Sequence, residues 1–194
     1  MKHLKMIATV AMTAMAAFAF VGAGSAAATT LEVEGVTQNK LVIISGSMMA
    51  GTSGILGRTD GSFANTCTTL AIEGSTVSPF TGATVTGSAT TFGFSNCERP
   101  IMTHKAGVIH GTHIAGTTNA TVVSSGAEVT TGSPFGTLNC KTGAGVHIGT
   151  LTGTAAGHAT LHVNAVLNCG FLVPSATLKG IGTVTSPTGL GVSA

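Results

Sequence analysis

The sequence predicts an all-β protein, folded as an antiparallel β-sandwich or a jelly-roll-like barrel, that follows an N-terminal signal helix. Three observations support this fold class. First, short segments rich in β-branched residues recur along the chain. Second, these segments are separated at short intervals by Gly, Ser, Thr or Asn. Third, no apolar pattern with a helical period occurs after Ala28. Many short strands with glycine-rich turns are typical of these two architectures.

Residues 1–27 have the features of a secretory signal peptide. A short basic segment, Met1–Lys5, leads into an apolar run that reaches about Val21, and small residues follow directly. Small residues suit the narrow pocket of a signal peptidase, so we expect cleavage after Ala27 or Ala28. The alternative, a membrane anchor, is disfavoured because the apolar run is short for a span and has no basic flank after it.

Residues 28–194 are expected to form a single all-β domain that is secreted to the periplasm, the medium or the cell surface, with no transmembrane segment after the signal. Of eight Lys and Arg, Lys2 and Lys5 belong to the signal, which leaves six against six Asp and Glu. The domain is therefore neutral. Nucleic acids and anionic membranes are bound through basic surfaces, which six scattered cations cannot form, so we expect neither partner.

The strands are predicted from the alternation of apolar residues and from the turn-forming residues between the segments. The clearest one covers Ala159–Cys169, where every second residue is apolar, which indicates a half-buried strand. Its apolar face consists of Ala159, Leu161, Val163, Ala165, Leu167 and Cys169. Similar segments predict further strands at Leu31–Val36, Lys40–Ser45, Cys67–Glu73, Ala83–Ser95, Gly107–Gly116, Ala120–Ser124, Gly145–Thr152 and Ala176–Val184. Prolines 79, 134, 174 and 187 are expected in turns or at strand ends.

Four cysteines, Cys67, Cys97, Cys140 and Cys169, predict disulfides, because their number is even and the chain leaves the reducing cytoplasm. The two shorter spacings, 30 and 29 residues, begin and end with similar residues. We therefore favour Cys67–Cys97 and Cys140–Cys169 among the three possible connectivities. A zinc site would need cysteines close together, as in C-x-x-C, and the chain has no such pair.

The histidines do not form an obvious metal site. His110 and His113 are an odd number of residues apart and would point to opposite faces of a strand. The histidines at 158 and 162 share a face but stand about 13 Å apart on an extended strand. We therefore predict no metal ligands and treat these side chains as surface residues. The alternative is a metal site assembled from separate strands with His104 or His147.

The sequence also lacks a recognisable catalytic or cofactor-binding set. Asp60 is the single aspartate that could serve a Ser–His–Asp triad, and no serine lies in a G-x-S-x-G elbow. The glycine-rich run Gly143–Gly149 opens no predicted helix and does not have the dinucleotide-binding spacing. We therefore expect no catalytic residues, no cofactor and no enzymatic activity.

Part of the chain resembles a bacterial family. The stretch Thr66-Cys67, Gly82–Ser88 and Cys97–Met102 resembles the pattern T-C…A-x-V-x-G-S…C-x-x-P-x-M of the small secreted proteins called protein activator of alkane oxidation (PraB-like). The segments 164–170 and 183–190 are similar to the ends of related secreted proteins, whereas 107–132 has no counterpart. The resemblance implies an exported accessory protein that helps cells to use or contact hydrocarbons, and it brings no catalytic residues.

Two function classes follow. The first is a secreted, non-catalytic accessory or surface protein that aids alkane utilisation or contact with hydrophobic surfaces. The second is a structural subunit of an extracellular fibre or adhesin, which would self-assemble. A neutral surface rich in Thr and Gly fits both. An outer-membrane barrel is disfavoured because such barrels carry aromatic girdles, and this chain contains no Trp and no Tyr.

Overall fold

The computed structural model of the chain describes residues 28–77, 80–105, 107–134, 136–171 and 173–194. The expected signal peptide lies outside these residues. The described part contains no helix that is long and apolar enough to span a membrane. Its strands are β1 Thr29–Val33, β2 Val36–Thr37, β3 Ile43–Met48, β4 Gly54–Arg58, β5 Ala64–Val77, β6 Thr81–Gly82, β7 Val85–Cys97, β8 Ile101–Lys105, β9 Val108–His113, β10 Ala120–Ser125, β11 Glu128–Ser133, β12 Gly136–Lys141, β13 Val146–Thr152, β14 Thr160–Leu167, β15 Ala176–Ser186 and β16 Leu190–Ser193.

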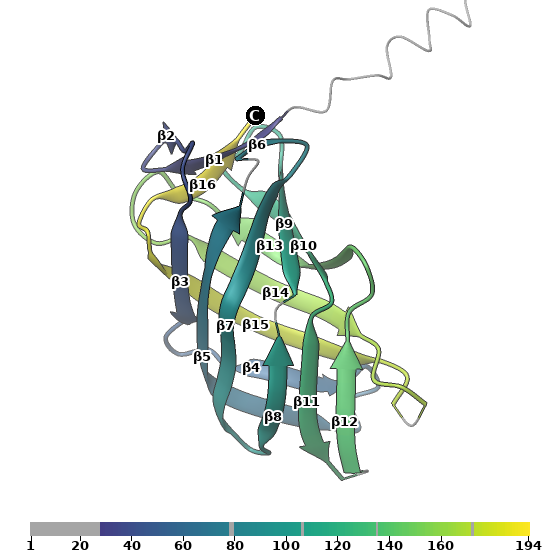
Figure 1. The fold of residues 1–194 in the computed structure, drawn as a ribbon. Helices are drawn as coiled ribbons and strands as arrows, with labels where there is room; N and C mark the ends of the chain where they lie inside the picture. The colour runs from purple at the N-terminus through teal and green to yellow at the C-terminus, as the bar shows by residue number, and fades with distance from the viewer. Residues whose placement is uncertain (1–27, 78–79, 106, 135, 172) are drawn as a thin grey trace, which may run out of the picture.

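Eight strands close into an antiparallel barrel (Figure 1). Their order is β14-β13-β10-β9-β7-β5-β3-β15, and β15 pairs again with β14 along its length. β4 lies in line with β3. The strand β3 pairs with one half of β5 and with one half of β15, and β4 pairs with the other half of each. The predicted all-β fold class is confirmed, and a closed barrel is the architecture that this chain adopts.

The part of the chain from β8 to β13 contributes to two sheets that follow each other end to end. β9, β10 and β13 belong to the barrel wall, whereas β8, β11 and β12 form a separate three-stranded sheet at its lower end in Figure 1. The breaks between the two fall near residues 107, 126 and 145, and each carries a glycine with positive φ. At Gly107 a Cβ would also collide with the backbone oxygen of Ser125, so only glycine fits this break.

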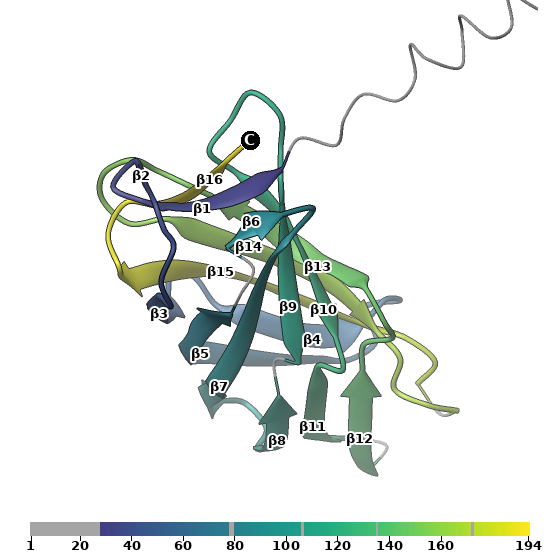
Figure 2. The same cartoon turned by 45° about the horizontal axis from the view of Figure 1, so that its top comes forward.

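A small sheet covers the upper end of the barrel, as Figure 2 shows. In it β1 pairs with β16, β2 and β6. Its inward side chains pack on those of the barrel, since Leu31 of β1 and Leu190 of β16 are buried together with Val85 and Val184. We call this group, completed by Ala159, the upper cluster.

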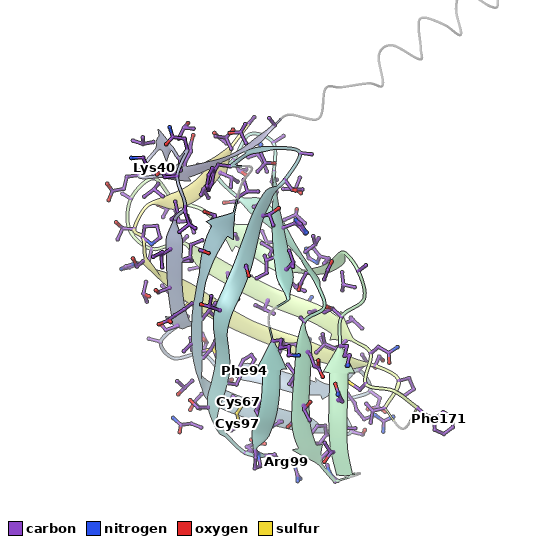
Figure 3. All side chains as sticks on the ribbon, in the orientation of Figure 1. Lys40, Cys67, Phe94, Cys97, Arg99 and Phe171 are labelled. Carbon is purple, nitrogen blue, oxygen red and sulfur yellow. A yellow bond between two sulfur atoms is a disulfide. The ribbon has the colours of Figure 1, made fainter. Side chains whose placement is uncertain are left out.

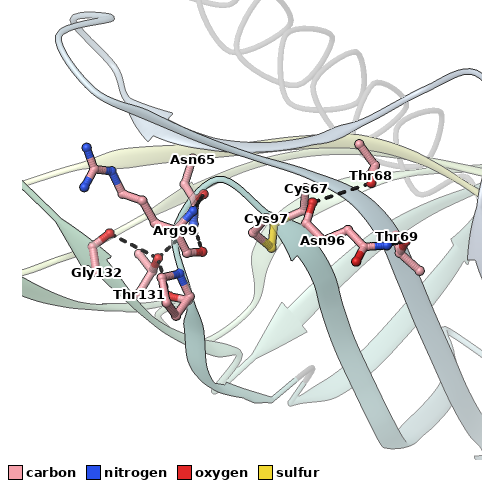
Figure 4. The surroundings of a disulfide bond; sticks show 10 residues. Asn65, Cys67, Thr68, Thr69, Asn96, Cys97, Arg99, Thr131 and Gly132 are labelled. Atoms are coloured by element: carbon pink, nitrogen blue, oxygen red, sulfur yellow. Dashed lines mark hydrogen bonds between the residues drawn. A yellow bond between two sulfur atoms is a disulfide. The ribbon is translucent and has the colours of Figure 1, made fainter.

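A larger apolar cluster fills the lower end. Here the three-stranded sheet faces β4, β14 and β15 across a core that consists of Leu56, Phe63, Val129, Leu138, Cys140, Ala165, Leu167, Cys169, Val173, Ala176 and Leu178. We call it the lower cluster. The side chain of Asn65 is fully buried and makes three hydrogen bonds (Figure 4). Its Nδ2 donates to the carbonyl oxygen of Arg99 and to Thr131 Oγ1, both at 3.0 Å, and its Oδ1 accepts a hydrogen bond from the backbone amide of Arg99. These hydrogen bonds join β5 to β11 across the lower end.

Most of the predicted strands occur within a few residues of their expected bounds, but several strands were not predicted. These are β4, β6, β8, β11, β12 and β16. Gly, Ser or Asn occurs in β4, β11, β12 and β16, which weakens the β-branched pattern from which strands are predicted, and β6 and β8 are only two and five residues long. Pro134, Pro174 and Pro187 lie outside strands, as expected, and Pro79 lies outside the described residues.

Candidate functional site

The two disulfides join the favoured pairs. Cys67 and Cys97 face each other across β5 and β7 (Figure 4). Cys140 of β12 is joined to Cys169, next to a backbone bridge between Lys141 and Asn168. The first disulfide joins the ends of two long barrel strands. The second joins the three-stranded sheet to the segment that follows β14 of the barrel. Their role in this fold is structural.

Three of the described histidines make side-chain hydrogen bonds within the fold. His110 Nδ1 lies 3.1 Å from Thr86 Oγ1, and His113 Nε2 lies 2.7 Å from the carbonyl oxygen of Thr117. His158 Nδ1 lies 2.9 Å from the carbonyl oxygen of Val184. The side chain of His104 lies outside the described part of the structure. Among the described residues, no three His, Cys, Asp or Glu side chains are grouped so that they could hold a metal ion.

The main feature of the barrel interior is an apolar cavity of about 210 Å³ between the upper and lower clusters. Aliphatic side chains from β3, β5, β9, β10, β11, β13, β14, β15 and β16 supply most of its wall. They are Ile44, Ile72, Ile109, Val122, Val129, Ile148, Leu151, Leu161, Val163, Ala165, Leu167, Leu178, Val184 and Leu190.

Strand β14 shows how the sequence builds this wall. Its alternating apolar residues all point inward, and Leu161, Val163, Ala165 and Leu167 line the cavity in succession. The residues between them are exposed, which is the alternation that a strand with one buried face requires. The face predicted from the sequence is therefore the face that lines the cavity.

Small residues explain why a hollow remains. Gly46 of β3, Ala165 of β14 and Gly182 of β15 occupy cavity-lining positions where a larger side chain would reach into the barrel. A Cβ placed on Gly182 would meet its nearest neighbour, the backbone oxygen of Ser47, at 3.5 Å, an ordinary contact distance. The backbone at Gly182 therefore has room for a side chain, and its absence leaves interior volume unfilled.

Part of the cavity wall lies at the break between the barrel wall and the three-stranded sheet. Lys105, Ala127, Glu128 and Thr142 line it there, and the Lys105 side chain is 65% exposed. The break is held closed on one side by two hydrogen bonds between Ala127 and Thr142, both 2.9 Å long. The surface of the cavity is almost entirely apolar, so the charged ends of Lys105 and Glu128 do not face it. Glu128 is the cross-strand partner of Lys105, and its neighbour Val129 is the residue whose side chain is buried.

Glu128 lies at the centre of a small charged group on the outer face of the three-stranded sheet. Its side chain, 19% exposed, lies between two lysines on the neighbouring strands, with Lys141 Nζ at 3.5 Å and Lys105 Nζ at 3.8 Å. A hydrogen bond from Asn139 Nδ2, 3.0 Å long, holds the pKa of the Glu128 carboxyl below its ordinary value, and the two lysines lower it further. Glu128 is therefore ionised at neutral pH.

Comparisons with known proteins give no relative for this chain: no protein-family model matches it, and neither a curated protein nor a solved structure matches it. The resemblance to the alkane-oxidation activators stays a hypothesis. The functional site described above was not among the sequence predictions, which named only the four cysteines. The signal that could have indicated it is the pairing of inward aliphatic residues with inward Gly and Ala on adjacent strands.

Proposed function

We propose that the chain is an exported, non-catalytic protein that binds small apolar molecules inside its barrel and so aids the use of hydrocarbons or contact with them. The observation that carries this proposal is the apolar cavity of about 210 Å³. A well-packed interior leaves few voids larger than a water molecule. An apolar hollow of about 150 Å³ stays dry and binds benzene, so this larger hollow suits a molecule of about eight carbon atoms.

The expected affinity is modest. Transfer of a chain of about eight carbons from water, at ~0.8 kcal/mol per carbon, is worth about 6 kcal/mol. Association and ordering costs reduce such gains: the binding free energy per ligand atom falls from about 1.5 kcal/mol in the best very small ligands to about 0.3 kcal/mol in drug-sized ones, and we take about 0.7 kcal/mol for a ligand of this size. The Kd would then be on the order of 0.1 mM. Such a protein would respond to apolar compounds that are plentiful around the cell.

Two further features support contact with hydrophobic material. Phe171 is 97% exposed and projects from the loop after β14 (Figure 3). A neutral domain also has few charges to desolvate when it approaches an apolar surface. The resemblance to the alkane-oxidation activators agrees with both features.

Export is part of the proposal. Disulfides are typical of oxidising compartments outside the cytoplasm, and both pairs are formed here. N-terminal sequencing of protein recovered from the culture should give Ala28 or Thr29 as the first residue. Protein that retains residues before Val21 would contradict export by a cleaved signal.

Titration with octane, followed by NMR of the methyl groups, tests the binding function. Saturable shifts are expected for Ile44, Leu161 and Val163, which line the cavity, and not for the exposed Val166 on the outer face of β14. Deletion of the gene should slow growth on long-chain alkanes and leave growth on a soluble carbon source unchanged. Equal shifts at Val166 and at the cavity residues would mean nonspecific binding.

Self-assembly into a fibre is a second candidate, favoured by one exposed apolar group. Val36, Leu41 and Ile43 are 63%, 57% and 68% exposed, and they follow one another closely on β2, β3 and the segment between them. Exposed apolar patches are common where protein surfaces associate. On a sizing column a fibre subunit would run as polymer, whereas the accessory binding protein would run as a small species.

A further inference from the structure

The described residues offer a ligand in the cavity almost no hydrogen-bond partner. The surface of the cavity is almost entirely apolar, although several of its lining residues carry polar groups. Thr142 Oγ1 accepts a hydrogen bond from the amide of Ala127. The Glu128 carboxylate accepts one from Asn139 Nδ2 on the outer face of the three-stranded sheet. Such residues therefore present carbon atoms to the cavity, and their polar atoms bind partners within the protein.

The backbone of the barrel wall is occupied by strand pairing. β10, for example, pairs with β9 and with β13 along its length. The N–H and C=O groups of paired strands point toward the neighbouring strands, within the wall, and side chains alone point into a barrel. A ligand in the cavity therefore meets aliphatic side chains rather than backbone dipoles.

A hydroxyl group on the ligand would have no partner in this cavity. An alcohol that enters loses its hydrogen bonds with water, and a hydroxyl buried without a partner is unfavourable. Turning the molecule round does not help, because both ends of the cavity are apolar. Val184 of the upper cluster lines one end, and Val129 of the lower cluster lines the other. An alkane has no polar group to desolvate.

We propose that the cavity is selective for unoxidised hydrocarbons and rejects the corresponding alcohols. This inference rests on the proposed function, because it names the ligand class of the same cavity. The protein would therefore hold a hydrocarbon before any oxygen is attached to it and would not retain an alcohol of the same size.

Octane and 1-heptanol test the proposal, because they have the same number of non-hydrogen atoms and differ only at one end. Protein with both disulfides formed is equilibrated with each probe through the vapour phase, and gas chromatography measures the probe dissolved in excess of buffer alone. The ratio of bound to free probe gives the affinity without saturating the cavity, which suits a sparingly soluble alkane. Binding that persists in Ala165→Leu, where leucine fills part of the cavity, is subtracted as binding elsewhere.

Octane should bind to the wild type at least about twentyfold more tightly than 1-heptanol. Burial of the additional methyl group accounts for about fourfold of this ratio, and the unpaired hydroxyl accounts for about fivefold or more.

Threonine in place of valine adds a hydroxyl group to the wall with little change of shape. Val184→Thr and Val129→Thr each place such a hydrogen-bond partner at one end of the cavity. One of the two should tighten 1-heptanol binding about fivefold and leave octane binding unchanged within about twofold. Val166→Thr, on the exposed face of β14, is the matched control and should equal the wild type with both probes.

If 1-heptanol binds in the cavity as tightly as octane or nearly so, or if neither end variant favours it, the selectivity proposal is wrong while the apolar binding function stands. If neither probe binds in excess of Ala165→Leu, the binding function fails as well. Thermal unfolding shows whether each variant is folded, and octane is an internal check, because a loss of structure would weaken the binding of both probes together.

Discussion

Replacement of Ala165 by leucine tests whether the barrel is hollow. Ala165 is 2% exposed, lies opposite Leu178 on β15, and lines the cavity. Leucine adds an isopropyl group that can extend into the empty space. At about 0.8 kcal/mol per buried carbon this gains ~2.4 kcal/mol. Loss of side-chain rotamers takes back about 0.5 to 1 kcal/mol.

We therefore expect Ala165→Leu to raise the free energy of unfolding by about 1.5 kcal/mol, which corresponds to ~3 to 6 °C in Tm for a domain of this size. Because the new side chain occupies the ligand's space, octane binding should be lost at the same time. Stabilisation together with loss of binding is the combination expected of a binding cavity and not of an ordinary core.

Ala176→Leu is the matched control. Ala176 is also 2% exposed and belongs to the lower cluster, but it does not line the cavity. The added atoms would have no space and should cost about 1 to 3 kcal/mol. Chemical denaturation of both variants measures the difference. If Ala165→Leu destabilises the protein as much as Ala176→Leu does, the interior is packed and the reasoning is refuted; if it stabilises the protein but leaves octane binding intact, the ligand binds elsewhere.

Three further predictions concern stability. Val163→Asp would place an unpaired charge in the cavity and should cost several kcal/mol, whereas the same change at the exposed Asn164 should do little, and equal thermal stability of the two variants would show that the faces of β14 are misassigned. Since the pKa of Glu128 is lowered in the folded protein, its stabilising effect is present above the ordinary value of 4.5 and is lost as the pH falls through the folded pKa. The wild type should thus be more stable than Glu128→Gln at neutral pH and lose this advantage in acid; an advantage independent of pH would contradict the assignment. Reduction of the disulfides, which close loops of 30 and 29 residues, should cost about 3 to 4 kcal/mol each, so denaturation midpoints unchanged by reductant would argue against a stabilising role.

Local features of the fold could be predicted because they depend on neighbours in the chain. The alternation at 159–169 identified β14 and its inward face, since side chains on a strand point to alternate sides. The similar residues around the cysteines led to the disulfide pairing that the structure shows. The glycine-containing strands β11 and β12 were missed because they are held by pairing with each other and with β8, which no local pattern reports.

The sequence by itself determined that this is an all-β chain, where most of its strands lie and which residues of β14 face inward, and it favoured the cysteine pairing that the structure shows. Only the tertiary structure decided that the sheet closes through β14 and β15, that β8, β11 and β12 separate from the barrel wall near Gly107, and that a cavity remains inside the barrel. The physical reason is that closure and volume are properties of the whole barrel. A hollow is the difference between the space that eight paired strands enclose and the summed volume of their inward side chains, and no single segment of the chain contains that difference.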